Sequence, residues 1–226
     1  MVDIHSHVIF GVDDGASSIE ESIELIKDMI KCGVTDLICT PHYRIGMFTT
    51  SEDIIENNFN LLLEEVKREN LDINLYLGRE VYYKKIVYES LELFKMNNKK
   101  TILIEFSYIN NPDVEEVLYN IKRLGYSVII AHVERYNYLT VNDIIALKSK
   151  NVYIQINAST IVGKDGFKEK KKAFKLIKAN VVDFIASDIH YNRNNYLKKS
   201  YDIISKKFGK EMATKLFVTN AKFIIE

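Results

Sequence analysis

Short apolar runs alternate with amphipathic segments from one end of the chain to the other. Seven of these runs are strand candidates, and most of them are continuous rather than apolar at every second position, which is typical of strands buried on both faces of a sheet. They cover residues 2–4, 36–39, 73–77, 101–104, 128–131, 152–156 and 182–186. We interpret them as seven strands.

Between these runs, apolar residues recur at helical spacing. The first amphipathic segment follows a Ser18-x-x-Glu21 capping box, which is typical of a helix N-terminus. A later one ends before Gly125, a residue suited to a helix C-cap. The recurring positions are Ile19, Ile23, Ile26 and Ile30, then Ile55, Phe59, Leu62 and Val66, then Val114, Val117, Leu118, Ile121 and Leu124. Strands alternating with helices predict a parallel sheet, either open or closed.

Polar residues that follow the predicted strands favour the closed form. In a closed barrel the carboxyl ends of all strands meet at one rim, whereas an open sheet spreads them along an edge. The residues are His5 and His7 after the first strand, His42, Glu80, Glu105 and His132 after the next four, and Asp188 and His190 after the seventh. We therefore predict an α/β fold, a single-domain (β/α)7 barrel with a site at the C-terminal rim of the strands.

The same donors predict a site for several metal ions. All five histidines of the chain follow a predicted strand, which chance placement does not explain. His5 and His7, like Asp188 and His190, are two positions apart and point to one side of an extended segment. Mixed imidazole and carboxylate donors suit manganese, iron or zinc, whereas an all-oxygen site suits magnesium or calcium. Because eight donors exceed the needs of one transition metal, we expect two or three clustered ions.

Composition narrows the classes of function. The 226 residues are 47% apolar and 27% charged, a globular balance that fits one domain over residues 1–226. Basic and acidic residues both number 31, which argues against a nucleic-acid partner because phosphate backbones attract basic surfaces. The densest basic stretch, residues 168–172, is interpreted as a solvated helix face.

The chain also lacks the sequence features of membrane insertion and export. Its apolar runs are shorter than the ~18 residues of a membrane span. Asp3 and His5 interrupt the N-terminus where the apolar part of a signal peptide would lie. The two cysteines, Cys32 and Cys39, have no metal-type spacing and indicate reduced thiols. We expect a cytoplasmic protein without direct membrane insertion.

Hydrolysis of a phosphate ester is the chemistry that such a metal cluster supports. A bound metal lowers the pKa of water from ~15.7 to ~7, which gives a hydroxide nucleophile at neutral pH. The phosphate charge also needs donors, and a guanidinium matches it best. Arg135 is the first candidate and Arg44 and Arg193 are the next, with a structural salt bridge as the alternative role for each. Arg79 is discounted, because it adjoins Glu80 and neighbours on a strand point in opposite directions.

Cysteine-based phosphate chemistry does not fit the spacing. That chemistry needs an arginine six positions after the cysteine, so that a loop of backbone N–H groups surrounds the phosphate. Cys39 precedes Arg44 by five positions, and Ile38 stands six positions after Cys32. A thiolate nucleophile is therefore not expected.

Seven motifs along the chain resemble the PHP (polymerase and histidinol phosphatase) superfamily, and more narrowly its bacterial tyrosine-phosphatase branch of the CpsB/YwqE type. They are Asp3-Ile4-His5-Ser6-His7, Gly11-Val12-Asp13-Asp14-Gly15-Ala16, Thr40-Pro41-His42, Gly78-Arg79-Glu80, Ile104-Glu105-Phe106, Ala131-His132-Val133-Glu134-Arg135-Tyr136 and Ser187-Asp188-Ile189-His190. Phe217-Val218-Thr219-Asn220 with Ile224 resembles the C-terminal end of the family. The likeness thus covers nearly the whole chain.

The resemblance implies a distorted seven-stranded barrel with a trinuclear centre, usually loaded with manganese. By position, His5, His7, Glu80 and Asp188 would hold one ion, Glu80, Glu105 and His132 a second, and Asp14, His42 and His190 a third, with the choice of Asp14 over Asp13 open. The implied activity is that of a protein-tyrosine phosphatase. Its substrate would be phosphotyrosine in the C-terminal tail of a bacterial tyrosine kinase that controls capsule or exopolysaccharide synthesis.

Other functions stay open at this point. A PHP phosphoesterase acting on a small metabolite such as histidinol phosphate would keep the same metal centre. Many PHP relatives carry histidine at the positions of Asp14 and Glu105, so the carboxylates argue against that alternative. A non-catalytic, metal-binding kinase scaffold is disfavoured by the intact donor set. No general acid is identified, and a phenol leaving group with a pKa of ~10 has less need of one. Tyr43, Tyr82, Tyr83, Tyr108 and Tyr136 lie near the predicted ligands and are interpreted as ordinary packing rather than as an aromatic cleft.

Overall fold

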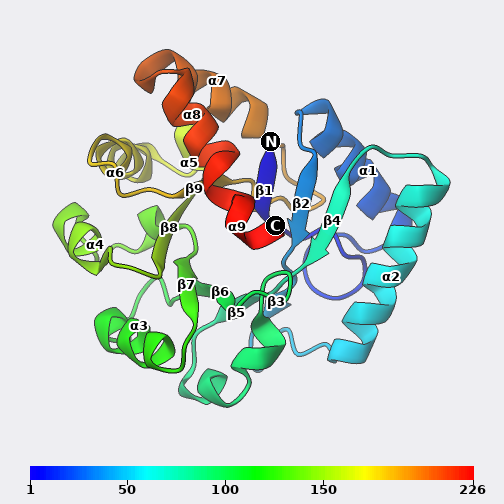
Figure 1. The fold of residues 1–226 in the computed structure, drawn as a ribbon, viewed down its shortest axis with the longest axis horizontal. Helices are drawn as coiled ribbons and strands as arrows, with labels where there is room; N and C mark the ends of the chain where they lie inside the picture. The colour runs from blue at the N-terminus through cyan, green and yellow to red at the C-terminus, as the bar shows by residue number, and fades with distance from the viewer.

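Parallel strands form a closed barrel that is wrapped by helices, which confirms the predicted fold class (Figure 1). The computed structural model describes residues 1–226, apart from the side chain of residue 86. Its strands form two sheets with the orders β1-β2-β4 and β3-β5-β6-β7-β8-β9. The strands are β1 (Val2–Ser6), β2 (Asp36–Cys39), β3 (His42–Tyr43), β4 (Asn74–Leu77), β5 (Glu80–Tyr82), β6 (Thr101–Glu105), β7 (Ser127–Ile130), β8 (Val152–Asn157) and β9 (Phe184–Ala186).

Two strand positions of the barrel are each broken into two pieces, a difference from the seven continuous strands predicted. After β2 the chain passes through Thr40 and Pro41 before β3, and after β4 it passes through Gly78 and Arg79 before β5. Pro41 has no N–H to contribute to a ladder. Single hydrogen bonds still link the broken segments, from Gly78 N to Cys39 O (2.9 Å) and from Glu80 N to Pro41 O (3.2 Å). The barrel is therefore distorted at this point but continuous.

The last strand returns to the first and closes the barrel. Ser6 and Ile189 form an isolated parallel bridge. The His7 N–H donates to Ile189 O at 2.9 Å, and the Asp188 N–H donates to His5 O at 2.9 Å. Below this bridge the Asp3 carboxylate accepts a hydrogen bond from Ser187 N at 2.9 Å. These contacts bring the carboxyl ends of β1 and β9 together.

Helices surround the barrel in the order in which the chain visits the strands (Figure 1). They are α1 (Ile19–Lys31), α2 (Glu52–Arg68), α3 (Val114–Arg123), α4 (Val141–Leu147), α5 (Ala158–Val162), α6 (Phe167–Lys178), α7 (Leu197–Phe208), α8 (Lys210–Phe217) and α9 (Lys222–Ile225), with 3-10 turns η1 (Lys85–Glu89), η2 (Leu91–Phe94), η3 (Val133–Arg135) and η4 (Thr219–Ala221). None of the helices described is long and apolar enough to cross a membrane.

The cap of α1 is only half of the predicted capping box. The Ser18 hydroxyl accepts from Glu21 N at 3.3 Å, as expected. The Glu21 carboxylate, however, accepts from Ser17 N at 2.6 Å rather than from Ser18 N. The reciprocal bond is therefore shifted by one residue towards the N-terminus.

Apolar side chains fill the amino-terminal end of the barrel and leave its carboxyl end to polar residues. The buried cluster inside the barrel includes Val2, Ile4, Ile38, Leu103, Ile129 and Phe184. Ile224 of α9 joins this cluster, and its carbonyl accepts from Asn97 Nδ2 at 2.9 Å. Figure 1 shows α9 lying across the ring of strands, with the C-terminus close to β1 and β2. The short C-terminal helix therefore closes the end of the barrel opposite the predicted site.

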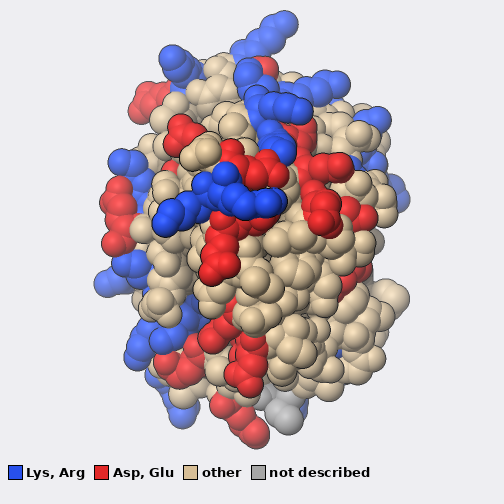
Figure 2. Space-filling model, turned by 90° about the vertical axis from the view of Figure 1, so that its right-hand side faces the viewer, with Lys and Arg blue, Asp and Glu red and all other residues tan. Residues whose placement is uncertain are grey.

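Both signs of charge are interspersed on the side of the molecule that carries α1 and α2 (Figure 2). The even balance of 31 basic and 31 acidic residues is thus also seen locally on this face. Nucleic-acid binding favours a concentrated basic stripe. This face does not present one.

Candidate metal centre

Strand alternation places several of the predicted donors on the inner face of the barrel. On three strand positions the polar residue lies two or four positions beyond an interior side chain, so that both point the same way. The pairs are Ile38 and His42, Tyr76 and Glu80, and Leu103 and Glu105. Asp188 lies two residues beyond the end of β9 and has a left-handed backbone with φ of 52°, so it is placed by its local turn rather than by alternation. The apolar interior and the polar rim are therefore successive layers of one pattern.

Two histidines reach the centre by breaking this alternation. His5 directly follows the interior residue Ile4, and the register between β1 and β2 shifts between Asp3 and Ser6. Such an irregularity changes which face the following side chains occupy. His132 directly follows the interior residue Ala131 and has a left-handed backbone with φ of 32°. Local backbone distortion thus turns both imidazoles inward.

Glu80 lies at the middle of the donor cluster. Its Oε2 is 3.1 Å from His5 Nε2, 3.3 Å from His7 Nε2 and 3.0 Å from His42 Nδ1. Its Oε1 is 2.8 Å from His132 Nε2. Burial opposes ionisation, but His5 and His42 hold the pKa of the Glu80 carboxyl well below its usual value. Glu80 is therefore a buried carboxylate with four imidazoles from three strand ends around it.

Asp188 and Asp14 extend the cluster on either side. Asp188 Oδ1 is 3.5 Å from His7 Nε2 and 3.8 Å from His190 Nδ1. Asp14 Oδ1 is 3.3 Å from His190 Nε2 and 3.5 Å from His42 Nε2, and the Asp14 side chain is 47% exposed. Asp14 thus stands at the solvent-facing edge of the cluster, whereas Asp188 is buried within it.

The donors form three overlapping groups. Within each group, the candidate ligand atoms all lie within 4.8 Å of one another. The groups are His5, His7, Glu80 and Asp188, then His7, Asp14, His42 and His190, then His42, Glu80 and Glu105. Several of these buried atoms, including Glu80 Oε2, Glu105 Oε2 and His190 Nε2, make no well-aligned hydrogen bond, although imidazole nitrogens lie close to Glu80 Oε2 and the Asp14 carboxylate lies close to His190 Nε2. Buried polar atoms that converge without hydrogen bonds are costly unless a cation satisfies them. The donor set fits metal ions.

Asp13 and Asp14, which the sequence leaves as alternatives, occupy different places. The Asp13 carboxylate lies behind His7, with Oδ2 at 2.7 Å from His7 Nδ1, and accepts from His42 N at 2.8 Å. Gly15 makes this arrangement possible, because a Cβ there would lie 2.0 Å from His7 O. Asp14 instead faces the other donors. The geometry favours Asp14 as a ligand and Asp13 as the residue that orients His7.

Gln155 and Asn157 support the cluster and were not identified from the sequence. Gln155 Oε1 accepts from His132 N at 2.9 Å and lies 3.3 Å from His5 Nδ1. Gln155 Nε2 donates to Asn157 Oδ1 at 2.6 Å, and Asn157 Nδ2 donates to Asp188 Oδ2 at 2.7 Å. Two amides at alternate positions of an otherwise apolar strand, β8, were the available signal. They connect donors from three strand ends.

Three arginines share one cavity with most of the donors. The cavity has a volume of about 190 Å³ and is lined by Asp14, His42, Arg44, Glu80, Glu105, Tyr108, His132, Arg135, Asp188, His190 and Arg193, among others. Arg135 Nη1 donates to Asp188 Oδ2 at 3.1 Å, and Arg193 Nη1 lies 3.9 Å from the same oxygen. The guanidinium of Arg44 lies 4.2 Å from the centre of the Tyr82 ring. The three predicted arginines therefore meet at the donor cluster.

Arg135 is not paired with Glu134, its neighbour in the sequence. Its second ion pair is with Asp165, at 3.5 Å from Nη2. Glu134 instead accepts from Asn157 N at 2.9 Å and from Thr160 Oγ1 at 2.8 Å. Although burial opposes its charge, the carboxylates around Arg135, Asp188 foremost, raise the pKa of its guanidinium. Arg135 is a fixed cation at the edge of the cavity.

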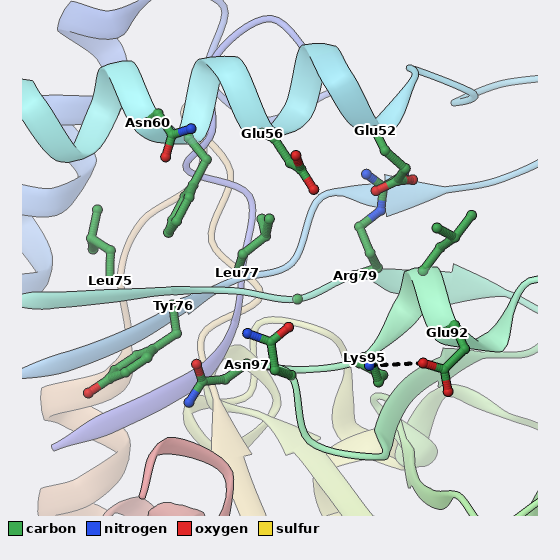
Figure 3. Close-up of a pocket in the computed structure, with 14 residues that line it drawn as sticks. Glu52, Glu56, Asn60, Leu75, Tyr76, Leu77, Arg79, Glu92, Lys95 and Asn97 are labelled. Carbon is green, nitrogen blue, oxygen red and sulfur yellow. Dashed lines mark ion pairs between the residues drawn. The ribbon is translucent and has the colours of Figure 1, made fainter.

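Arg79 points away from the donor cluster, as strand alternation predicts. It lies beside a separate depression of about 470 Å³ between α2 and β4, where its guanidinium approaches Glu52 at 3.5 Å (Figure 3). Only 1% of Arg79 is exposed. The same figure shows Lys95 paired with Glu92 at one side of the depression, and their charged atoms are 2.9 Å apart. Arg79 therefore joins α2 to the barrel behind the centre.

The two thiols lie away from this cavity. Cys39 is fully buried in β2, and burial raises the pKa of its thiol. Cys32 is half-buried at the end of α1 and also has a raised thiol pKa, first because of burial. Neither sulfur lines the cavity described above. Their environments disfavour thiolates.

Comparisons with known proteins agree over the whole length of the chain. Residues 1–226 match the family model for capsular polysaccharide synthesis, CpsB/CapC. The chain is 39% identical to the tyrosine-protein phosphatase CpsB of Streptococcus agalactiae, over 100% of this chain and 98% of that protein. It is 29% identical to the tyrosine-protein phosphatase YwqE of Bacillus subtilis, over 100% of this chain and 91% of that protein.

Solved structures give the same result. A structure from a study of YwqE of Bacillus subtilis and CpsB of Streptococcus pneumoniae, described there as metal-dependent tyrosine phosphatases, matches with a TM-score of 0.86 and 27% identity, covering 94% of this chain and 90% of that one. Histidinol phosphate phosphatase of Lactococcus lactis, with zinc, histidinol and phosphate, matches with a TM-score of 0.59 and 15% identity over 94% and 93%. The second likeness shows the fold alone. The expected family is confirmed: the chain belongs to the CpsB/CapC family of capsular polysaccharide synthesis proteins.

Proposed function

We propose that this chain is a metal-dependent protein-tyrosine phosphatase that acts at the cavity described above. The observation that carries the proposal is the meeting of three arginines with seven imidazole and carboxylate donors in one small cavity, with His5 and His7 buried directly behind it. The relatives support the same activity, because CpsB and YwqE are tyrosine-protein phosphatases. The fold and the local chemistry thus support one function.

The proposed centre holds two or three ions, with manganese as the resident metal and iron, zinc or magnesium as substitutes. The ligands are His5, His7, Glu80 and Asp188 for one ion, Glu80, Glu105 and His132 for a second, and Asp14, His42 and His190 for a third. The first set coincides with one of the three geometric groups, and the third lies within another. For the second set, Glu80 and Glu105 group together and His132 Nε2 lies 2.8 Å from Glu80.

The chain's own residues would bind and orient the phosphate. Such metal ions, when bound, acidify water and neutralise phosphoryl oxygens. Arg135 and Arg193 stand beside Asp188 and can donate to phosphoryl oxygens on the side facing the cavity. Arg44 approaches from the loop after β3. A phenolate leaves readily, with a pKa of ~10 for its acid, so the lack of an identified general acid fits an aryl ester.

The proposed substrate is a phosphotyrosine-bearing protein, specifically the C-terminal tail of a bacterial tyrosine kinase that controls capsule or exopolysaccharide synthesis in the cytoplasm. The name of the matching family supports the link to capsule synthesis. Phosphorylated small metabolites are the competing substrates. Carboxylates at Asp14 and Glu105 disfavour them, and the likeness to histidinol phosphate phosphatase extends only to the fold.

The test compares two substrates on one preparation. A tyrosine-phosphorylated peptide and histidinol phosphate are offered separately to the manganese-loaded protein, with and without a chelator. We expect turnover of the peptide to be faster by orders of magnitude and to stop on chelation. The double variant Cys32→Ser, Cys39→Ser should retain this turnover.

Three results would contradict the proposal. Faster turnover of histidinol phosphate than of the peptide would show that the chain is a phosphatase of small metabolites. No turnover by a folded, metal-loaded protein would favour the kinase scaffold. Loss of turnover in the folded, metal-loaded double cysteine variant would reinstate a thiol mechanism.

A further inference from the structure

Tyr108 stands at the mouth of the donor cavity. It follows β6 by three residues, and its hydroxyl donates to Glu105 Oε1 at 2.6 Å. Its ring lies nearly parallel to that of Tyr136, with centroids 5.9 Å apart and planes at 26°. Tyr136 is itself fully buried, and its hydroxyl donates to Ala131 O and accepts from Phe106 N. The Tyr108 side chain is thus held by Tyr136 on one face of its ring and by Glu105 at its hydroxyl.

One part of the Tyr108 side chain is left for a ligand. The residue is 39% exposed, although its hydroxyl is hydrogen-bonded and one ring face is stacked. Tyrosine and other aromatic rings bind a second ring by offset or edge-to-face contact. The Tyr108 ring is ordered, is open on one side and lies next to Glu105, a proposed metal ligand. It can therefore pack against an aromatic ring of a substrate.

The cavities around the site all meet at this ring. The donor cavity of about 190 Å³ is lined by Tyr108 and Arg135. Two outer depressions, of about 520 Å³ and about 300 Å³, are lined by the same two residues. A phosphate bound at the donor cluster leaves its ester group to extend into one of these depressions. In either direction, that group passes Tyr108.

We propose that Tyr108 is the specificity-determining residue that selects aryl over alkyl phosphoesters, by packing its ring against the aromatic ring of the substrate. The proposal rests on the proposed function, because it assumes that phosphate binds at the metal centre. It replaces our interpretation of Tyr108 as ordinary packing. The hydroxyl has a separate, positioning role, because it fixes the carboxylate of Glu105.

Binding of two phosphonates separates these roles without requiring turnover. Phenylphosphonate and methylphosphonate share the anionic group and differ in the ring, so the ratio of their dissociation constants isolates the contribution of the ring. The ratio is measured by calorimetry on manganese-loaded wild type, Tyr108→Phe and Tyr108→Ala. Tyr119→Leu, which removes an exposed tyrosine on α3, is the matched control.

We expect Tyr108→Ala to weaken phenylphosphonate relative to methylphosphonate by about tenfold, near the upper end of aromatic pair energies. Tyr108→Phe and Tyr119→Leu should keep the wild-type ratio within about twofold. An unchanged ratio in Tyr108→Ala would overturn the proposal, as would an equal loss of the ratio in the Phe and Ala variants. Turnover of the phosphotyrosine peptide by wild type tests the proposed function separately, so that its failure is distinguishable from a failed assignment of Tyr108.

Discussion

The carboxylate of Asp13 is hydrogen-bonded to the imidazole of His7 on the side of the ring that faces away from the donor cluster, with Asp13 Oδ2 at 2.7 Å from His7 Nδ1. This leaves His7 Nε2 directed at Glu80 and Asp188. Carboxylates behind metal-binding histidines fix the tautomer and the orientation of the ring. We therefore predict that Asp13→Ala lowers metal affinity by about 10-fold to 100-fold, the usual effect of losing such a partner.

Asp14→Ala is the matched comparison for that prediction. As the removal of a proposed ligand, it should reduce the number of bound ions by one even at saturating manganese. Asp13→Ala should reach the wild-type number when enough metal is supplied. Metal analysis across a manganese titration distinguishes the two patterns, and interchanged behaviour would assign the ligand role to Asp13.

Arg135 is expected to contribute to turnover rather than to folding. Arg135→Ala should lower kcat/KM for a phosphotyrosine peptide by roughly a hundredfold or more, equivalent to about 2.7 kcal/mol of transition-state stabilisation. Metal content should change little, because Asp188 keeps its hydrogen bond from Asn157 Nδ2 at 2.7 Å. Arg135→Lys should recover little, since an ammonium cannot form a bidentate pair.

A structural role for Arg135 would give the opposite result. Its ion pair with Asp165, at 3.5 Å, would then be the contact that matters. In that case Arg135→Ala would lower the melting temperature and leave kcat/KM within a few-fold of wild type. Measuring both quantities on the same variant decides the role.

The inward-facing donors were predictable because period-two alternation requires little more than the position of each strand. Leu103 and Glu105, for example, share a face in any regular strand. The pairing shift that turns His5 inward depends on how β1 pairs with β2, which is a property of two strands rather than of one segment.

The supporting residues were harder to foresee. Gln155 acts on His132 from 23 residues away, and no local pattern encodes that distance. The breaks that separate β3 and β5 from β2 and β4 were visible as Thr40-Pro41 and Gly78-Arg79, but the strand pieces beyond them are only two and three residues long. Such short segments carry no periodicity of their own.

Arg79 and Glu52 form the ion pair behind the metal centre. The loss of Arg79 and the loss of Glu52 should change the stability of the protein by different amounts. Arg79 is buried, whereas the Glu52 side chain is 29% exposed. Glu52→Gln leaves a buried guanidinium without its counter-charge, which costs about 3 kcal/mol in comparable pairs. Arg79→Met removes the buried charge and leaves a carboxylate that can turn towards water, so its cost should be about 1 kcal/mol or less.

Chemical denaturation of both variants measures this difference. Because Glu52 is also the first residue of α2, its interaction with the helix dipole is lost too. Asp53→Asn, in the same first turn but exposed, gives the size of that contribution. A greater destabilisation by Arg79→Met than by Glu52→Gln would show that Arg79 stabilises the fold by packing rather than through its charge.

We predict that deprotonation of Lys172 raises the stability of the protein at alkaline pH. The stretch 168–172 is not wholly solvated, as the sequence suggested, because Lys172 of α6 is half-buried and its Nζ donates to Tyr136 O at 2.7 Å. Burial lowers the pKa of this amine from 10.5 to about 8. Between these values the unfolded chain keeps the proton that the folded chain has lost, so the free energy of unfolding should rise with pH. Below about pH 8 both states are protonated, and the cost of burying the charge is present in full.

The difference in unfolding free energy between wild type and Lys172→Met isolates this contribution. We expect wild type to gain stability relative to the variant as the pH rises from about 8 to 10.5, the interval between the two pKa values. Lys171→Met, which alters an exposed neighbour on the same helix, should follow the wild-type profile. Urea unfolding at several pH values, with a chelator present throughout so that metal binding does not vary, provides the measurement. A difference that stays constant across this interval would mean that Lys172 titrates alike in the folded and unfolded chains. Its bond to Tyr136 would then stabilise the protein without the desolvation cost inferred from its burial.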